Sequence, residues 1–168
     1  MAKVVTYLEM NNATDLRPGK VVPELSLRRV DVGLPLVHAI NAQVGAPHGW
    51  RCASRTSEEW QELMRSRPLR QYRFITLKDE TVGVANVEPH PGGDVEITAF
   101  GLLPEHVGKG LGGHALTLTI RQAWDMVALE SPAVHRVWLH TCSLDHPNAL
   151  GNYQRRGMTV YRTEVEAE

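Results

Sequence analysis

Hydrophobic and polar residues alternate in several short segments of this chain, and this alternation predicts β-strands with one buried face. The most regular segments, residues 71–79, 81–89 and 94–103, are separated only by turn signals. Their close succession predicts an antiparallel meander. Further strands are predicted at residues 3–10, 25–30, 135–144 and 158–166.

Other segments carry apolar residues at the spacing of an amphipathic helix. Residues 34–45 show this spacing and end on Gly45, which favours a helix stop there. A second helix is expected after Thr56, because Thr56 and Glu59 have the spacing of a capping box. Pro68 should end this second helix.

The longest predicted helix runs from about Gly108 to about Leu129. Its apolar stripe consists of Leu116, Ile120, Ala123 and Val127. A short helix over residues 148–157 should close on Gly157, which suits the residue after a helix end. The order of elements predicts an α+β fold of mixed α/β layers, with a right-handed parallel crossover from the strand near residue 95 to the strand near residue 142.

The composition mainly excludes other classes of protein. The 168 residues suit one domain, and a net charge of −1 without a basic block gives no sign of a nucleic-acid partner. No apolar run approaches the roughly 20 residues of a membrane span, so no membrane association is expected. Cys52 and Cys142 suggest no disulfide framework, and the histidines match no zinc spacing. We therefore expect a cytoplasmic protein without a metal.

The most informative stretch is residues 100–115, FGLLPEHVGKGLGGHA, where an apolar strand leads through glycines into a helix. Glycine lets the backbone approach a ligand closely, and a helix start offers unpaired N–H groups to a phosphate. The glycines formally match a dinucleotide fingerprint, but they follow a meander rather than a first strand. A nucleoside-triphosphate loop would need Lys-Ser/Thr where this chain has His114 and Ala115. Glycines alone would also suit a turn that serves only helix–sheet packing.

The segment from Pro104 to Gly112 resembles the acyl-coenzyme-A-binding turn of the GNAT N-acetyltransferase superfamily. That signature reads Gln or Arg, two residues, Gly, one residue, then Gly or Ala. Gly110 and Gly112 occupy its glycine positions, whereas Val107 departs from the usual Gln or Arg. Residues 148–158 resemble the second motif of the family, in which Asn opens a helix and Tyr follows five residues later. The order and separation of the two motifs also fit.

The resemblance implies the GNAT fold, a central twisted mixed sheet of about six to seven strands flanked by about four helices. It covers roughly residues 25–163 within a single domain of residues 1–168. Residues 1–24 are expected outside the common core, as an N-terminal extension that looks like a short strand found in one bacterial branch of the family. Frequent dimers in the family leave a homodimer open.

The resemblance also implies acetyl-CoA as the cosubstrate, with its pyrophosphate held by backbone N–H groups of the turn. The residues of this turn are Val107, Gly108, Lys109, Gly110, Leu111, Gly112 and Gly113. Leu102 matches the position whose N–H meets the acetyl oxygen, and Asn148 matches the position that contacts the pantetheine arm. Asn148 also suits a helix cap, and both roles are compatible.

Direct acetyl transfer to an amine needs a base for the amine and an acid for the departing thiolate. Tyr153 matches the usual general acid of the family, although it could instead only pack against the coenzyme or core. Glu96 lies on the strand that enters the glycine turn, at the spacing of family members that use a strand Glu as base. The sequence leaves open whether Glu96 acts directly, acts through water or lies on a solvated face shared with Thr98 and Phe100.

The acceptor site is defined less sharply. The polar run at residues 140–146 interrupts an apolar strand, so His140 and Thr141 are candidates to line it. The loop before the second helix occupies the position that usually covers the acceptor, where Trp50 could receive an ammonium and Arg51 or Arg55 a carboxylate. Each of these residues could instead serve packing or solvation.

The resulting prediction is an N-acetyltransferase that acts on a primary amine of a small molecule or peptide. Two alternatives remain at this point. One is a non-catalytic acyl-CoA-binding module on the same fold, and the other is an interaction protein whose N-terminal strand pairs with a partner chain.

Overall fold

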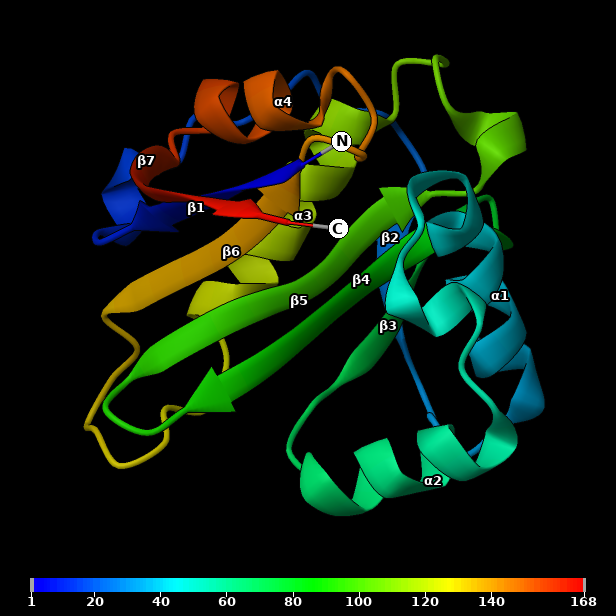
Figure 1. Cartoon of the computed structure of the whole chain (residues 1–168). Helices are drawn as coiled ribbons and strands as arrows, with labels where there is room; N and C mark the ends of the chain where they lie inside the picture. The colour runs from blue at the N-terminus through cyan, green and yellow to red at the C-terminus, as the bar shows by residue number, and fades with distance from the viewer. Residues whose placement is uncertain (1, 168) are drawn as a thin grey trace.

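The computed structural model describes residues 2–167 and contains one twisted sheet with helices on both faces (Figure 1). The seven strands follow the order β2-β3-β4-β5-β6-β1-β7. Their bounds are β1 Lys3–Met10, β2 Leu25–Val30, β3 Tyr72–Leu77, β4 Glu80–His90, β5 Asp94–Leu102, β6 Arg136–Cys142 and β7 Thr159–Glu166. The mixed sheet and the helices around it confirm the expected fold class.

Four α-helices surround the sheet, namely α1 Pro35–Gly45, α2 Ser57–Ser66, α3 Gly112–Trp124 and α4 Ala149–Arg155. Short 3-10 helices occupy η1 Ala13–Asp15, η2 Ala46–His48, η3 Arg51–Ala53 and η4 Pro104–His106. Helices α1 and α2 cover one face of the sheet, while α3 and α4 lie on the other (Figure 1). Each face buries its own apolar cluster, because strand side chains alternate between the two faces.

The predicted meander is confirmed, since β3, β4 and β5 pair antiparallel in succession. Strand β5 then pairs with β6 in parallel, and α3 lies in the connection between them. The apolar stripe of α3 packs on this part of the sheet, with Leu116 and Ile120 fully buried against Val95 and Ile97. This packing fixes the start of α3 beside the end of β5.

The first strand belongs to the central sheet. Residues 1–24 were expected outside the core common to the family, as an extension with a short strand, and in the structure β1 lies between β6 and β7 and pairs antiparallel with both. Leu8 and Met10 are completely or almost completely buried in the cluster beneath α3. The local pattern predicts a strand correctly here, but strand order depends on long-range pairing that a local pattern does not contain.

The long helix is shorter than predicted at both ends, because α3 begins at Gly112 and ends at Trp124. Val127, which was assigned to its buried stripe, lies beyond the helix and is 88% exposed. Residues after the helix instead approach the β4–β5 turn, where Leu129 forms a bridge with Pro91. The sequence keeps its helical spacing beyond Trp124, but the backbone there leaves the helix and runs to this bridge.

The predicted helix boundaries at Thr56 and Gly157 are confirmed. Thr56 and Glu59 form a reciprocal capping box at the start of α2. At the end of α4, the N–H of Gly157 donates to Gln154 and the N–H of Met158 donates to Tyr153. Gly157 has a φ of 103°, so α4 ends in a Schellman motif that only glycine adopts easily. This motif turns the chain from α4 directly into β7.

Candidate active site

Two cavities meet where strands β5 and β6 separate. The strands pair only from Asp94 to Glu96 and from Arg136 to Trp138, and no pairing continues beyond these residues within the described chain. A larger cavity of about 400 Å³ and a smaller one of about 350 Å³ occupy the space around this divergence. The residues that line both cavities are His48, Trp50, Phe100, Asp145 and Tyr153. These shared residues define the junction, a term used below for this set alone.

The smaller cavity is bounded by the glycine turn. Among residues 2–167, the N–H groups from Gly108 to Gly113 donate to no other group of the protein, and the first helical bond of α3 is made by the N–H of Ala115. Gly108 and Gly110 have φ angles of 80° and 77°, a region that side chains with a Cβ rarely adopt. The turn therefore presents unpaired donors and the positive end of the α3 dipole to the cavity.

Two residues predicted for this turn behave differently from the rest. The N–H of Val107 donates to the carbonyl of Pro104 at 3.3 Å and closes the short helix η4, so it is not free for a phosphate. Lys109 is absent from the residues that line the smaller cavity, whereas Val107, Gly108, Gly110, Leu111, Gly112 and Gly113 are among them. The sequence motif locates the turn correctly but does not show which N–H groups the local turn uses.

Helix α4 forms the opposite wall of the smaller cavity. Asn152 donates to the carbonyl of Gly112 at 3.1 Å and so ties α4 to the start of α3. Asn148 lines the cavity, and its side chain makes no capping hydrogen bond, so it is available to a ligand. Leu102 also lines this cavity, at the end of β5. These contacts bring the two sequence motifs to one site.

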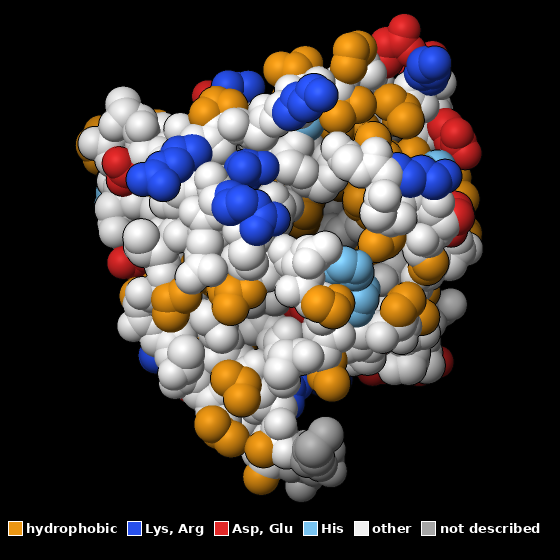
Figure 2. Space-filling view, turned by 90° about the horizontal axis from the view of Figure 1, so that it is seen from above, with side chains coloured by type: hydrophobic (Ala, Val, Ile, Leu, Met, Phe, Trp, Pro, Cys, Tyr) orange, Lys and Arg blue, Asp and Glu red, His pale blue; other side chains and the backbone are white. Residues whose placement is uncertain are grey.

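Arg155 and Arg156 also line the smaller cavity and were not assigned to the site from the sequence. Arg156 Nη1 lies 3.4 Å from Asn152 Oδ1, and burial lowers the pKa of the Arg156 guanidinium, with a smaller contribution from Arg155. Seen from above, the molecule is hollowed here, and Lys and Arg side chains gather beside the hollow (Figure 2). The doubled arginine two residues after Tyr153, within the second motif, was the sequence signal that could have identified this positive wall.

Tyr153 lies at the junction, where its side chain is nearly buried. Its ring meets Phe100 edge-on at a centroid distance of 6.4 Å, and no hydrogen bond from its hydroxyl is found among the described residues. Burial raises the pKa of the Tyr153 phenol well above its ordinary value, and the negative charge of Asp145 raises it further. Tyr153 is therefore a neutral proton carrier at physiological pH, held beside both cavities.

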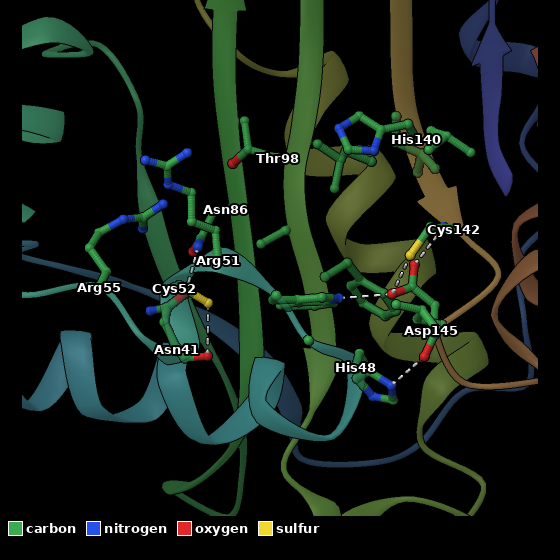
Figure 3. A pocket seen from close by; sticks show the side chains of 18 of the residues that line it. Asn41, His48, Arg51, Cys52, Arg55, Asn86, Thr98, His140, Cys142 and Asp145 are labelled. Atoms are coloured by element: carbon green, nitrogen blue, oxygen red, sulfur yellow. Dashed lines mark hydrogen bonds between the residues drawn. The ribbon is translucent and has the colours of Figure 1, made fainter. Parts of the chain in front are cut away.

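Asp145 fixes the wall between the cavities. Its carboxylate, labelled in Figure 3, accepts hydrogen bonds from Trp50 Nε1 at 2.8 Å and the N–H of Cys142 at 3.0 Å. It also accepts one from Thr141 Oγ1 at 2.5 Å. Trp50 is thereby held across the junction by a residue 95 positions away. Thr141, which was predicted to line the acceptor site, is buried and is not among the cavity residues. Its hydroxyl instead orients Asp145.

The larger cavity contains Trp50, Arg51 and His140, as predicted for the acceptor side. Arg51 and Arg55 lie on one side of this cavity, and His140 and Cys142 lie on the other (Figure 3). Cys52 also lines it, but its thiol donates to the carbonyl of Asn41, and burial raises its pKa. Cys52 is therefore a poor nucleophile.

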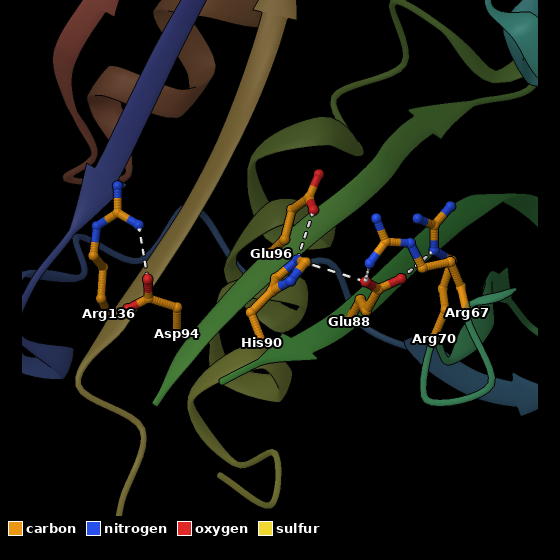
Figure 4. A network of polar contacts seen from close by, with 7 residues as sticks. All are labelled: Arg67, Arg70, Glu88, His90, Asp94, Glu96 and Arg136. Atoms are coloured by element: carbon orange, nitrogen blue, oxygen red, sulfur yellow. Dashed lines mark hydrogen bonds and ion pairs between the residues drawn. The ribbon is translucent and has the colours of Figure 1, made fainter. Parts of the chain in front are cut away.

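Glu96 is not among the residues that line either cavity. Its carboxylate contacts His90 Nε2 at 2.9 Å, and His90 continues to the buried carboxylate of Glu88 at 3.6 Å (Figure 4). Arg70 and Arg67 complete the same network, at 2.7 and 3.5 Å from Glu88. The structure thus places Glu96 in an ion network directly before Ile97, the first residue of β5 that lines the larger cavity.

His48 is a junction residue that sequence reasoning passed over as part of a loop. Its Nδ1 lies 3.2 Å from the carbonyl oxygen of Leu144, which can only accept a hydrogen bond. Nδ1 therefore carries the hydrogen, and Nε2 of the neutral ring keeps a free lone pair. The only local signal was a histidine beside the tryptophan of the predicted covering loop.

Neither a metal cluster nor a membrane helix is found in the part of the chain that the structure describes. Over residues 2–167, no group of three or more His, Cys, Asp or Glu side chains could hold a metal ion. Over the same residues, none of the helices is both long enough and apolar enough to cross a bilayer.

Comparison with known proteins identifies the family. The model of the "Acetyltransferase (GNAT) family" matches residues 42–158, well over half of the chain. No curated protein sequence matches this chain significantly.

Several solved structures share the fold. A GCN5-related N-acetyltransferase from Sphaerobacter thermophilus matches 98% of this chain and 50% of its own, with 17% identity and a TM-score of 0.66. One from Kribbella flavida matches 96% of this chain and 56% of its own, with 19% identity and a TM-score of 0.65. A tandem GNAT protein from the clavulanic acid biosynthesis pathway matches 98% of this chain and 51% of its own, with 18% identity and a TM-score of 0.60.

Identities this low show a common fold and nothing further, and this chain spans only about half the length of these proteins. The family match itself extends across both the glycine turn and the helix that carries Tyr153. The chain therefore belongs to the GNAT family of acetyltransferases, and acyl transfer is the chemistry that this membership supports.

Proposed function

We propose that the protein transfers the acetyl group of acetyl-CoA directly to a primary amine. The observation that carries this proposal is the junction, where a cavity bounded by unpaired backbone N–H groups opens beside a second cavity at Tyr153. A donor in the first cavity and an acceptor in the second would meet at one point, without a covalent enzyme intermediate.

The smaller cavity suits the donor. The pyrophosphate would bind the N–H groups from Gly108 to Gly113, and Arg155 and Arg156 would add positive charge. The pantetheine arm would follow the end of β5, past Leu102 and Asn148, toward the junction. This route leads the thioester to Phe100 and Tyr153.

In the proposed step, the amine nitrogen attacks the thioester carbonyl carbon, the N–C bond forms and the C–S bond breaks. The products are an N-acetyl amide and the CoA thiol, so one proton leaves nitrogen and one reaches sulfur. Tyr153 would supply the proton to sulfur, since its buried phenol stays protonated. Tyr153 would regain that proton from solvent after the products leave.

Removal of the proton from the amine has two candidate routes. Glu96, the base expected from the family resemblance, lies outside the cavities and would reach the amine only through water. His48 lies at the junction with a free Nε2 and would accept the proton directly. The geometry supports His48 as the immediate proton acceptor, with Glu96 in a relayed role.

A comparison of His48→Gln with Glu96→Gln tests this order. We expect His48→Gln to lower kcat by about 100-fold and Glu96→Gln by less than about 10-fold, because His48 lines both cavities and Glu96 lines neither. The measurement is initial-rate thiol release at saturating acetyl-CoA. His135→Gln is the matched control, because His135 is exposed and lines neither cavity. A larger loss of kcat in Glu96→Gln than in His48→Gln would indicate that Glu96 is the base.

The function itself is tested by titration calorimetry with acetyl-CoA, followed by a screen of primary amines for acetyl-CoA-dependent thiol release. We expect saturable binding at one site and steady-state turnover with at least one class of amine. Binding without turnover for any amine would indicate a non-catalytic acyl-CoA-binding module. No heat with acetyl-CoA at millimolar concentrations would remove the acetyltransferase proposal.

A further inference from the structure

The wall of the larger cavity contains two buried oxygen atoms without hydrogen-bond partners, Asn86 Oδ1 and Thr98 Oγ1. Asn86 is only 4% exposed, and it lies on β4 beside the strand that carries Thr98. A buried polar atom without a partner costs free energy, so its retention calls for a ligand. Both side chains are labelled in Figure 3.

A β-bulge brings these oxygens to the cavity. Asn86 pairs with Ala99 and Val87 pairs with Ile97, so Thr98 is an extra residue without a partner on β4. Such a bulge redirects one side chain out of the regular alternation. Thr98 and Asn86 both line the larger cavity at this bulge.

The orientation of the Asn86 amide follows from a chain of hydrogen bonds. Asn41 Nδ2 donates to the carbonyl of Val37 at 2.8 Å, and a carbonyl can only accept. Asn41 Oδ1 must then accept from Asn86 Nδ2, also at 2.8 Å. Asn86 Oδ1 is the atom left over, so the cavity presents an acceptor that a ligand N–H would satisfy.

The mouth of the same cavity carries uncompensated positive charge. Of its cations, Lys3 is paired with Glu166 at 3.0 Å and Arg70 with Glu88 at 2.7 Å. Arg55 rests on the Trp60 ring at 4.7 Å, and no carboxylate pairs with it among residues 2–167.

Arg51 adds to this charge, since it is 82% exposed and reaches its only ion-pair partner in the described chain, Glu59, at 3.9 Å. Arg51 and Arg55 therefore have charge available for an anionic ligand group.

We propose that the acceptor is a small molecule that carries both a primary amine and a carboxylate. Asn86 Oδ1 and Thr98 Oγ1 receive N–H groups of the amine, and Arg55, with Arg51, receives the carboxylate. This inference rests on the proposed acetyl transfer. Thr98 is two residues before Phe100 on β5, so the amine is held on the strand that leads into the junction.

The test compares amino acids with the amino alcohols in which a hydroxymethyl group replaces the carboxylate. The probes are β-alanine, L-leucine and L-phenylalanine, each with its amino alcohol, so that the amines keep similar basicity. We expect kcat/KM for thiol release to be at least about 10-fold higher for the best amino acid than for its amino alcohol. Equal or higher values for every amino alcohol would overturn the inference, while turnover with them would still support acetyl transfer.

Variants separate the two halves of the site. Arg55→Gln should raise KM about 10-fold or more for the amino acid and leave KM for the amino alcohol unchanged. Thr98→Val should raise KM for both by a similar factor, and Thr98→Ser, which keeps the hydroxyl, should restore it. Arg65→Gln is the matched control on α2, since Arg65 lines neither cavity.

A thermal shift in the presence of CoA gives a readout that does not depend on turnover. The amino acid probe should raise the melting temperature of the wild-type CoA complex, and Arg55→Gln should abolish this increase. An unchanged increase in Arg55→Gln, or unchanged KM values in both Arg55→Gln and Thr98→Val, would contradict the assigned site. Loss of all turnover with every amine, in folded wild-type protein that binds CoA, would instead count against the proposed function.

Discussion

Replacing Tyr153 with Phe is expected to lower kcat by about 100-fold while leaving the Kd for acetyl-CoA unchanged. The substitution removes one hydroxyl, for which no hydrogen-bond partner is found among residues 2–167, and keeps the ring that packs on Phe100. Folding should therefore be preserved, and the loss should fall on protonation of the departing sulfur. Initial-rate kinetics, together with calorimetric titration of acetyl-CoA, separate the two effects.

The pH dependence strengthens this test. Burial raises the pKa of Tyr153, so its phenol remains protonated up to and beyond pH 10, and the wild-type enzyme should show no alkaline loss of kcat from this group. The difference in kcat between the wild-type enzyme and Tyr153→Phe should become smaller above about pH 8.5, because a thiolate leaves there without needing a proton. Tyr161→Phe is the control, because Tyr161 is exposed on β7 and lines neither cavity. Full activity of Tyr153→Phe at pH 7 would exclude the acid role.

Replacing Gly110 with Val is expected to raise the Kd for CoA by about 100-fold. Gly110 has a φ of 77°, which a β-branched residue adopts only with strain, and the loop should relax away from this conformation. In the relaxed loop, the N–H groups proposed to bind the pyrophosphate would no longer point to one place. Loss of about two hydrogen bonds to a charged group, at about 1.5 kcal/mol each, corresponds to roughly this factor.

The structure offers a matched control for this prediction at Gly92. Gly92 has a φ of 90°, and an added Cβ at either Gly92 or Gly110 would meet nothing within 4 Å. Gly92 lies in the β4–β5 turn and lines neither cavity, so Gly92→Val should cost similar stability without affecting CoA. Calorimetric titration of both variants gives the comparison. Equal Kd values for Gly110→Val and wild type would show that the turn does not grip the coenzyme.

The donor side of the site was largely predictable because its signals are local. Positive φ angles, a free helix start and a helix end at Gly157 each depend on a few neighbouring residues, and glycine marks them directly. The turn was therefore located from its glycines, and Tyr153 was singled out by the resemblance of its helix to the second motif of the family. The local signal did not show that the N–H of Val107 already donates to the carbonyl of Pro104.

The acceptor side was predictable only in part because its residues meet through long-range pairing. Asn86 and Asn41 are 45 positions apart, and Trp50 and Asp145 are 95 apart. The bulge after Asn86 breaks the alternation that seemed to put Glu96 and Phe100 on one face, because their partners Glu88 and Ala85 are three positions apart on β4. A single sequence contains no signal for such a bulge, because the shift in register arises from the pairing of two strands.

By itself, the sequence determined the element types, the meander, the glycine turn and the helix that carries Tyr153, because these follow from periodicity, glycine and capping within short windows. Tertiary structure decided that β1 lies inside the sheet, that β5 and β6 diverge after Glu96 and that His48, Asn86 and Arg55 line the larger cavity. The physical reason is that strand order, register and cavity walls depend on contacts between distant segments, which form only when the whole sheet assembles.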